Sequence, residues 1–321
     1  MVGAAYGMDE PIAADQLSIQ LANLTHWVQS AAYGQTIQTK EQQGGRGWVI
    51  SSELVEPRTL PIPQGTLRVT QSVGVTGDGV TSRTLTQNAG FHLKFDNPLP
   101  LDEVVDLASD LQDLVSIGTD SAAAFERFWL WHPDFFRQRD DGEHVPLPVE
   151  YLAEWHARPG ERKQPPSDYD MPFTFTELGG LDGVVKWLDV AAKYRTMLGA
   201  VMNTGYGRPM FVNDRLLERL AALEGYHRVR TGMEAPGLQL RLSDLTDLAG
   251  LPFEQLVGDV AAWRRRASAE RNNIAHHKGR PARQSSAHMY FTAACSVKPR
   301  PLSQFSTIWC AARGSSGPPR S

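Results

Sequence analysis

The stretch Glu270-Arg-Asn-Asn-Ile-Ala-His-His277 ends a long amphipathic segment and is followed almost at once by Gly279 and Pro281. A set of residues spaced three or four apart runs up to and into this stretch. Its members are Leu256, Val260, Trp263, Ala267, Arg271 and Ile274. This spacing predicts a helix over residues 253–276 with one apolar face. Because Arg271 falls on that face, its charge is costly unless it is paired or functional.

Arg271 and His276 form an Arg-x4-His pair, and a polar residue, Asn272, follows the arginine directly. The composition predicts about 0.7 such pairs by chance, and the chain contains three others, at Arg127/His132, Arg139/His144 and Arg283/His288. Arg127/His132 lies in an aromatic stretch that resembles a buried strand, with Arg127 at its edge or paired. Arg283/His288 lies in a tail rich in Gly, Pro and Ser. Only the pair at 271 and 276 is on a predicted helix. The alternative is a structural arginine tied to a carboxylate such as that of Glu224, beside an exposed histidine.

Composition gives the broad class of the chain. Apolar residues make up 41% and charged residues 21%, as in ordinary globular proteins. No apolar run reaches the length of a membrane span, and the N-terminus lacks a basic-then-apolar export signal, so we expect a cytoplasmic protein without membrane attachment. Both cysteines, Cys295 and Cys310, lie in the tail, and the nine histidines form no ligand cluster. We therefore predict no disulfide framework, no metal and no cofactor.

The net charge of −4 conceals an asymmetry. Residues 1–161 carry 10 basic and 22 acidic side chains, a net −12, whereas residues 162–321 carry 22 basic and 14 acidic, a net +8. A basic C-terminal half suits a polyanionic partner. Six of those basic residues lie after residue 278, so residues 162–278 are only +2.

The N-terminal half predicts a small antiparallel sheet or sandwich. Alternating polar and apolar residues indicate strands, and residues 25–28 form a short turn or helix with Trp27 packed inward. The predicted strands are residues 16–24, 47–55, 66–75, 82–86, 90–95 and 122–132. A helix starts at Asp102, and we expect its acidic residues to be solvated or, alternatively, to face a basic partner domain. Those acids are Glu103, Asp106, Asp110 and Asp113.

The remaining chain is predicted to be helical. Residues 133–166 contain six prolines and no clear period, which is typical of a linker with at most a short helix near 150–155. Helices are predicted over residues 181–202, 213–230, 240–248 and 253–276, enough for a small bundle. The fold class is therefore α+β, an antiparallel β domain followed by an all-α bundle. The expected divisions are 1–132 (β domain), 133–170 (linker), 171–278 (helical domain) and 279–321 (tail).

Three ordered blocks carry a resemblance to a known family. They are Phe173-Thr-Phe-Thr-Glu-Leu-Gly-Gly180 running into Trp187-Leu188, Leu220-Ala-Ala-Leu-Glu-Gly-Tyr-His-Arg228, and Arg271-Asn-Asn-Ile-Ala-His276. Residues 171–277 resemble an ApeA-type HEPN domain. Residues 3–117 resemble the ApeA N-terminal domain, especially at Leu21-Ala-Asn-Leu-Thr-His-Trp27. The resemblance implies an abortive-infection anti-phage protein, an antiviral nuclease that hydrolyses RNA and works as a homodimer.

The family pattern differs from this chain at both ends. The family's β domain begins before the point where this chain starts, so we expect residue 1 to be an internal start. After His277 the family continues as an apolar helix, whereas residues 279–321 are rich in Ser, Pro and Arg and contain no acid. We expect a reading-frame shift near residue 280 and a damaged or truncated copy.

The resemblance also implies a site. RNA supplies its own nucleophile, the 2′-OH, so a metal-independent endoribonuclease needs a base and a cation. His276 suits the base and Arg271 the cation that stabilises the phosphorane. Asn272 fixes the histidine tautomer or contacts phosphate. Arg271 and His276 lie about 140° apart on a straight helix, so the helix must end or distort, or two subunits must share one groove.

Further residues complete the expected site. Glu224 and His227 either orient Arg271 or pack the bundle. Arg265, Arg266 and Lys278 are expected to bind RNA phosphates, while Arg264 is solvated. The expected partners are RNA, with tRNA as a candidate, a second copy of the chain, and a phage-derived trigger at the N-terminal domain. The alternative function is a HEPN-like binding or dimerisation module without catalysis, or a degenerate, inactive copy.

Overall fold

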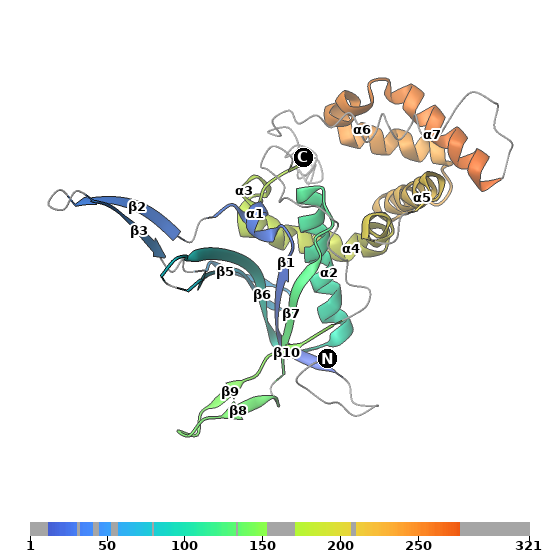
Figure 1. Cartoon of the computed structure of the whole chain (residues 1–321). Helices are drawn as coiled ribbons and strands as arrows, with labels where there is room; N and C mark the ends of the chain where they lie inside the picture. The colour runs from blue at the N-terminus through green and yellow to red at the C-terminus, as the bar shows by residue number, and fades with distance from the viewer. Residues whose placement is uncertain are drawn as a thin grey trace, which may run out of the picture. The chain divides into compact units, whose positions relative to one another are not determined.

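The computed structural model describes residues 12–30, 33–40, 45–52, 57–78, 80–132, 134–152, 171–206 and 210–276. The chain divides into two compact units, an N-terminal unit of residues 1–189 and a C-terminal unit of residues 190–321. The first is built on an antiparallel sheet and the second is helical (Figure 1). The predicted α+β class is confirmed. No helix in the described ranges is both long and apolar enough to span a membrane.

A six-stranded antiparallel sheet organises the N-terminal unit, in the order β10-β7-β1-β6-β5-β4. Its strands are β1 (Ala13–Leu21), β4 (Thr59–Ile62), β5 (Gly65–Thr76), β6 (Thr84–Pro100), β7 (Phe125–Trp131) and β10 (Val149–Glu150). Two hairpins lie outside this order, one of β2 (Tyr33–Lys40) and β3 (Gly45–Ser52), the other of β8 (Phe136–Gln138) and β9 (His144–Pro146). The unit also contains α1 (Leu24–Val28), α2 (Leu101–Thr119) and α3 (Phe175–Leu178).

Several sequence predictions for this unit are corrected in detail. The two strands predicted at 82–86 and 90–95 form the single strand β6, which pairs with β5 along its length and continues through Asn97 to Pro100. The region predicted as a linker contains β8, β9 and β10, and β10 joins the main sheet beside β7. The short helix expected at 150–155 is absent from its described part, because residues 149–150 are a strand and 151–152 are irregular. Residues 153–170 lie outside the described ranges.

The core of the N-terminal unit lies between one face of the sheet and α2. Strand residues on this face alternate with outward-facing ones, as a pleated strand requires. Side chains that are 0% exposed come from both layers. The large ones include Leu17, Ile19, Leu67, Phe91, Leu93, Leu111 and Leu114. This shared burial holds α2 on β1 and β6.

The expectation that the acids of α2 are solvated is wrong for two of them. Asp110 and Asp113 are 1% and 6% exposed. The second side of α2 is covered by a later segment, since the Nε1 of Trp187 donates to the carbonyl of Asp110 at 2.6 Å. The backbone N–H of Phe173 donates to the carbonyl of Gly118 at 3.5 Å. An amphipathic pattern cannot show that the polar side of a helix has a second neighbour.

Trp27 joins the same segment to the sheet, and its predicted inward packing is confirmed, because it is 0% exposed. Its Nε1 donates to the carbonyl of Phe173 at 2.8 Å, and its ring packs edge-on against Phe175 at a centroid distance of 5.5 Å. Gly118 lies under the indole so closely that an added Cβ would be 2.4 Å from Nε1. Thr174 and Glu177 then begin α3 with a reciprocal capping box.

The C-terminal unit consists of the second half of α4 (Gly180–Tyr206) with α5 (Val212–Thr231), α6 (Leu238–Val257) and α7 (Val260–Ala275). All four predicted helices are present. The third is longer than predicted, because helix resumes after Gly250, whose φ of 61° and ψ of −148° interrupt it. The fourth is shorter. Gly258, with a φ of 72°, ends α6, and the Asp259 carboxylate caps α7 by accepting from the N–H of Ala262.

Candidate functional site

The helix α7, which carries the Arg-x4-His pair, packs against α5 and α6, and Figure 1 shows α6 and α7 side by side. The three helices share a small core of Leu220, Leu242 and Ala267, against which Trp263 also packs. Trp263 lies edge-on to Phe253 of α6 at a centroid distance of 4.9 Å. The apolar stripe predicted for α7 therefore faces its neighbours, and this packing fixes the direction in which its polar residues point.

Arg271 lies at the edge of this core and is paired. Its Nη2 is 3.4 Å from Oε1 of Glu224 on α5. The two side chains are 37% and 20% exposed, so the guanidinium keeps a solvent-facing side. The ion pair is the arrangement expected of a structural arginine. It also holds the cation in one place, as a phosphate-binding group requires.

His276 and Asn272 are exposed. His276 follows the last residue of α7, and its backbone N–H still donates to the carbonyl of Asn272 at 3.1 Å. The helix therefore ends at His276, and the chain leaves its helical course only from that residue on, with a φ of −106° and a ψ of 10°. His276 thus starts about 140° around the helix from Arg271. One copy of α7 presents the two side chains on different sides.

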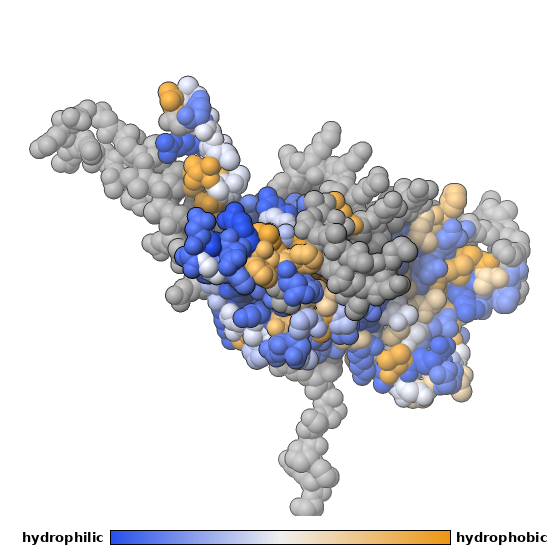
Figure 2. Space-filling model, turned by 90° about the horizontal axis from the view of Figure 1, so that it is seen from below, coloured by the Kyte–Doolittle hydropathy of each residue, from blue (hydrophilic) through white to orange (hydrophobic). Residues whose placement is uncertain are grey.

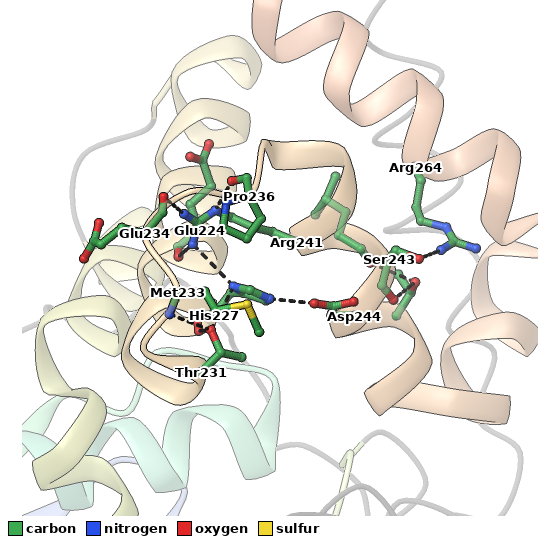
Figure 3. Close-up of polar contacts among 12 residues, drawn as sticks. Glu224, His227, Thr231, Met233, Glu234, Pro236, Arg241, Ser243, Asp244 and Arg264 are labelled. Atoms are coloured by element: carbon green, nitrogen blue, oxygen red, sulfur yellow. Dashed lines mark hydrogen bonds and ion pairs between the residues drawn. The ribbon is translucent and has the colours of Figure 1, made fainter.

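His227, by contrast, is 0% exposed and lies inside a polar network between α5 and α6 (Figure 3). Its Nε2 is 2.9 Å from Oδ2 of Asp244, and its Nδ1 is 3.3 Å from Nη1 of Arg241. A guanidinium can only donate, so Nδ1 must accept and the ring proton lies on Nε2, directed at Asp244. This tautomer is assigned from the hydrogen-bond partners. His227 packs the bundle.

Arg241 is the centre of that network, and it is 3% exposed. Its Nε donates to the carbonyl of Pro236 and its Nη2 to that of Glu234, both at 2.8 Å. Its Nη1 also reaches the carbonyl of Glu224 at 3.4 Å. Sequence reasoning missed Arg241. The signal was present, because Leu238, Arg241, Leu242 and Leu245 follow the same 3–4 residue spacing that singled out Arg271.

We expect Arg241→Ala to destabilise the C-terminal unit by about 3 kcal/mol, because the buried Nδ1 of His227 and two carbonyls of the α5–α6 connection lose their donor. Urea unfolding followed by far-UV circular dichroism measures the change. Arg230→Ala, which removes an exposed arginine of α5, is the matched control and should shift the free energy of unfolding by less than about 0.5 kcal/mol. Equal effects of the two substitutions would contradict a supporting role for Arg241.

The three consecutive arginines of α7, residues 264–266, differ in their exposure to solvent. Arg265 and Arg266 are exposed, as an RNA-contacting role requires, and the Nε of Arg266 also donates to the carbonyl of Ala262 at 3.3 Å. Arg264 was expected to be solvated, but it is half-buried and its Nη1 donates to Oγ of Ser243 on α6. Lys278 and His277 lie outside the described residues. Within the described ranges, no three His, Cys, Asp or Glu side chains cluster so as to hold a metal ion.

The comparisons with known proteins concern the sheet-containing part of the chain. The first domain has a six-stranded antiparallel sheet with α2 on one face, and the segment of Phe173 and Trp187 covers the other side of α2. The chain is therefore an α+β protein whose first domain extends into α4. The family model of ApeA N-terminal domain 1 matches residues 1–187, and the chain belongs to that family. No curated protein and no solved structure matches.

The match extends into the segment that carries the resemblance to a HEPN domain. Residues 173–180 and Trp187, which belong to that resemblance, lie within the N-terminal family match. The match ends two residues before the N-terminal unit does, at Asp189. The contacts of Trp27 and Asp110 give the physical reason, since both bind this segment. The match associates the chain with a family of anti-phage defence proteins.

Proposed function

We propose that this chain is a metal-independent endoribonuclease of an abortive-infection defence system. One observation carries the proposal. The helix α7 holds Arg271, a cation braced by Glu224, five residues before His276, which is exposed at the helix end. The family match to an ApeA domain supports the defence setting. A phage-derived trigger is expected to act through the N-terminal unit.

The proposed reaction uses the 2′-OH of the RNA as nucleophile. His276 takes the proton from that hydroxyl, and the 2′-oxygen attacks the adjacent phosphorus. Arg271 stabilises the negative charge that develops on the phosphorane oxygens. The bond from phosphorus to the 5′-oxygen then breaks, which leaves a 2′,3′-cyclic phosphate and, after a proton reaches the leaving oxygen, a 5′-hydroxyl. We expect Asn272, exposed one turn before His276, to contact the same phosphate or the imidazole.

The roughly 140° between Arg271 and His276 favours a site made by two copies. If α7 helices from two chains line one groove, the arginine of one copy can face the histidine of the other. The proposal therefore includes a homodimer. Arg265 and Arg266, exposed on the same helix, would then extend the groove with phosphate-binding cations.

The test is to incubate the purified chain with labelled RNA, tRNA included, in EDTA, and to analyse the product ends. We expect cleavage that leaves a 2′,3′-cyclic phosphate. Mixing Arg271→Ala chains with His276→Ala chains tests the shared site, because mixed dimers would contain one intact pair and regain part of the activity. Cleavage that stops in EDTA would rule out the metal-independent mechanism.

A second candidate function is a HEPN-like binding or dimerisation module without catalysis. The observation that favours it is the Arg271–Glu224 ion pair itself, which gives Arg271 a structural role on its own. This candidate predicts no RNA cleavage with or without EDTA, but unchanged dimerisation in the His276→Ala chain. Sedimentation of both chains beside the cleavage assay distinguishes the two functions.

A further inference from the structure

The outer face of the sheet, opposite α2, is polar, basic and aromatic. The register aligns Trp129, Ser18, His92 and Arg68 in one row across four strands. Their strand neighbours on the same face follow from the alternation of side chains. The outer face consists of Gln16, Ser18, Gln20, Thr66, Arg68, Thr70, His92, Lys94, Arg127, Trp129 and Trp131. The residues that alternate with them form the core beneath α2.

Two tryptophans of β7 provide aromatic surface on this face. Trp129 and Trp131 are each partly exposed, whereas Phe128 and Leu130, which alternate with them, are buried. The guanidinium of Arg127 lies 4.8 Å from the centroid of Trp129. The ring of His92 meets Trp131 edge-on at a centroid distance of 6.0 Å. These contacts hold both indoles in place. The two rings start about 7 Å apart along the strand.

Three permanent cations lie around these rings. Arg68, Lys94 and Arg127 make no ion pair with any residue that the structure describes, and Nε of Arg68 is buried without a hydrogen-bond partner there. Glu150 lies on the edge strand β10, opposite Trp129, and Asp96 lies two residues beyond Lys94. Two further acids are next to this face in sequence, Asp15 at the bulge of β1 beside Gln16, and Glu126 beside Arg127.

His92 contributes a ring rather than a charge. Burial, together with the nearby charges of Arg68 and Lys94, lowers the pKa of His92 from 6.5 to about 4. It is therefore neutral at neutral pH. The face thus combines fixed aromatic rings with cations that form no ion pair with the acids that the structure describes. In the view of Figure 2, hydrophobic areas lie among hydrophilic ones on the coloured part of the surface.

We propose that this outer face binds single-stranded nucleic acid, with bases against Trp129 and Trp131 and phosphates at Arg68, Lys94 and Arg127. Aromatic rings on an open sheet stack against unpaired bases, and neighbouring cations follow the backbone. A duplex hides its bases and could use only the cations. An acidic polypeptide could likewise use the cations but has no bases to stack. The inference concerns the N-terminal unit and requires no cleavage by the C-terminal one.

The test measures binding of fluorescein-labelled single strands by fluorescence anisotropy, with RNA and DNA of the same sequence as separate arms. The full chain carries His276→Ala in every sample to prevent cleavage. Replacing both tryptophans by alanine should weaken binding about tenfold or more. Replacing both by phenylalanine, which keeps a stacking ring, should leave affinity within about threefold. The phenylalanine pair separates lost stacking from lost folding.

The cations are tested by the salt dependence of binding. The triple variant Arg68→Ala, Lys94→Ala, Arg127→Ala should lower the slope of log K against log salt by about 2, since each phosphate contact on a single strand contributes about 0.7. A matched triple variant at Arg83, Arg137 and Lys186 removes three exposed cations elsewhere on the unit. It should leave both affinity and slope nearly unchanged.

Three results would overturn the proposal. The first is no binding of either single strand by the full chain. The second is equal binding by the tryptophan-to-alanine variant and the unchanged chain, or a loss confined to Arg265→Ala, Arg266→Ala chains. The third is competition by polyglutamate as strong as competition by unlabelled single strand, which would indicate an acidic protein partner instead.

Discussion

We expect the His276→Ala chain to cleave RNA about 10²- to 10⁴-fold more slowly than the unchanged chain, because it loses the group that takes the proton from the 2′-OH. His276 is exposed at the end of α7, where it follows the last helical residue and packs against no core. The substitution should therefore leave the unfolding midpoint unchanged. Rates of RNA cleavage in EDTA, measured under single-turnover conditions, give the comparison.

The matched control is His26→Ala, which removes an exposed histidine from α1 in the N-terminal unit. It should cleave RNA at the rate of the unchanged chain. Arg271→Lys adds a second comparison, because it keeps the charge near Glu224 but loses the planar fork that binds a phosphate at two oxygens. Undiminished cleavage by the His276→Ala chain would remove His276 from the mechanism and favour the non-catalytic module.

We expect Trp27→Ala to destabilise the N-terminal unit by about 3–5 kcal/mol, the usual range for removing a fully buried aromatic side chain. Trp27 is 0% exposed, donates to the carbonyl of Phe173 and packs edge-on against Phe175. Its removal leaves a cavity and an unpaired carbonyl at once. Thermal and urea unfolding of the full chain, followed by near-UV circular dichroism, measure the loss.

Two further substitutions make this result specific. Gly118→Ala should destabilise the same unit, because the added Cβ would lie 2.4 Å from the indole Nε1 and force the ring to move. Phe136→Ala removes an aromatic ring that is 41% exposed and should cost less than about 1 kcal/mol. If Trp27→Ala unfolded no more easily than Phe136→Ala, residues 171–188 would not be an integral part of the N-terminal unit.

The helices of the C-terminal unit were predictable because each carries a long apolar stripe. The boundary between the last two helices, α6 and α7, was not predictable from the sequence. Leu256 and Val260 fit one continuous stripe, so the break at Gly258 and Asp259 was hidden by a spacing that happens to continue across it. The capping carboxylate of Asp259 was the signal that could have located the true start of α7.

Burial of polar residues was the harder problem. The acids of α2 were assigned to solvent from the pattern of one helix, but Asp110 and Asp113 are buried, and Trp187, some seventy residues later, donates to the carbonyl of Asp110. In the candidate site, the pairing of Arg271 with Glu224 was predictable from the position of Arg271 on an apolar stripe. The Arg241 network was not, because two of its three acceptor carbonyls lie in the α5–α6 connection, which no periodicity describes.

The order of the strands also determines how the sheet behaves toward other copies of itself. The ladder β10-β7-β1-β6-β5-β4 ends on one side in a strand of two residues and on the other in a strand of four that contains Pro61. Short outer strands offer few free backbone groups to an incoming strand, and proline removes one donor outright. Strand β1, which is paired with β6 on one side and with β7 on the other, is thus shielded from edge-to-edge polymerisation.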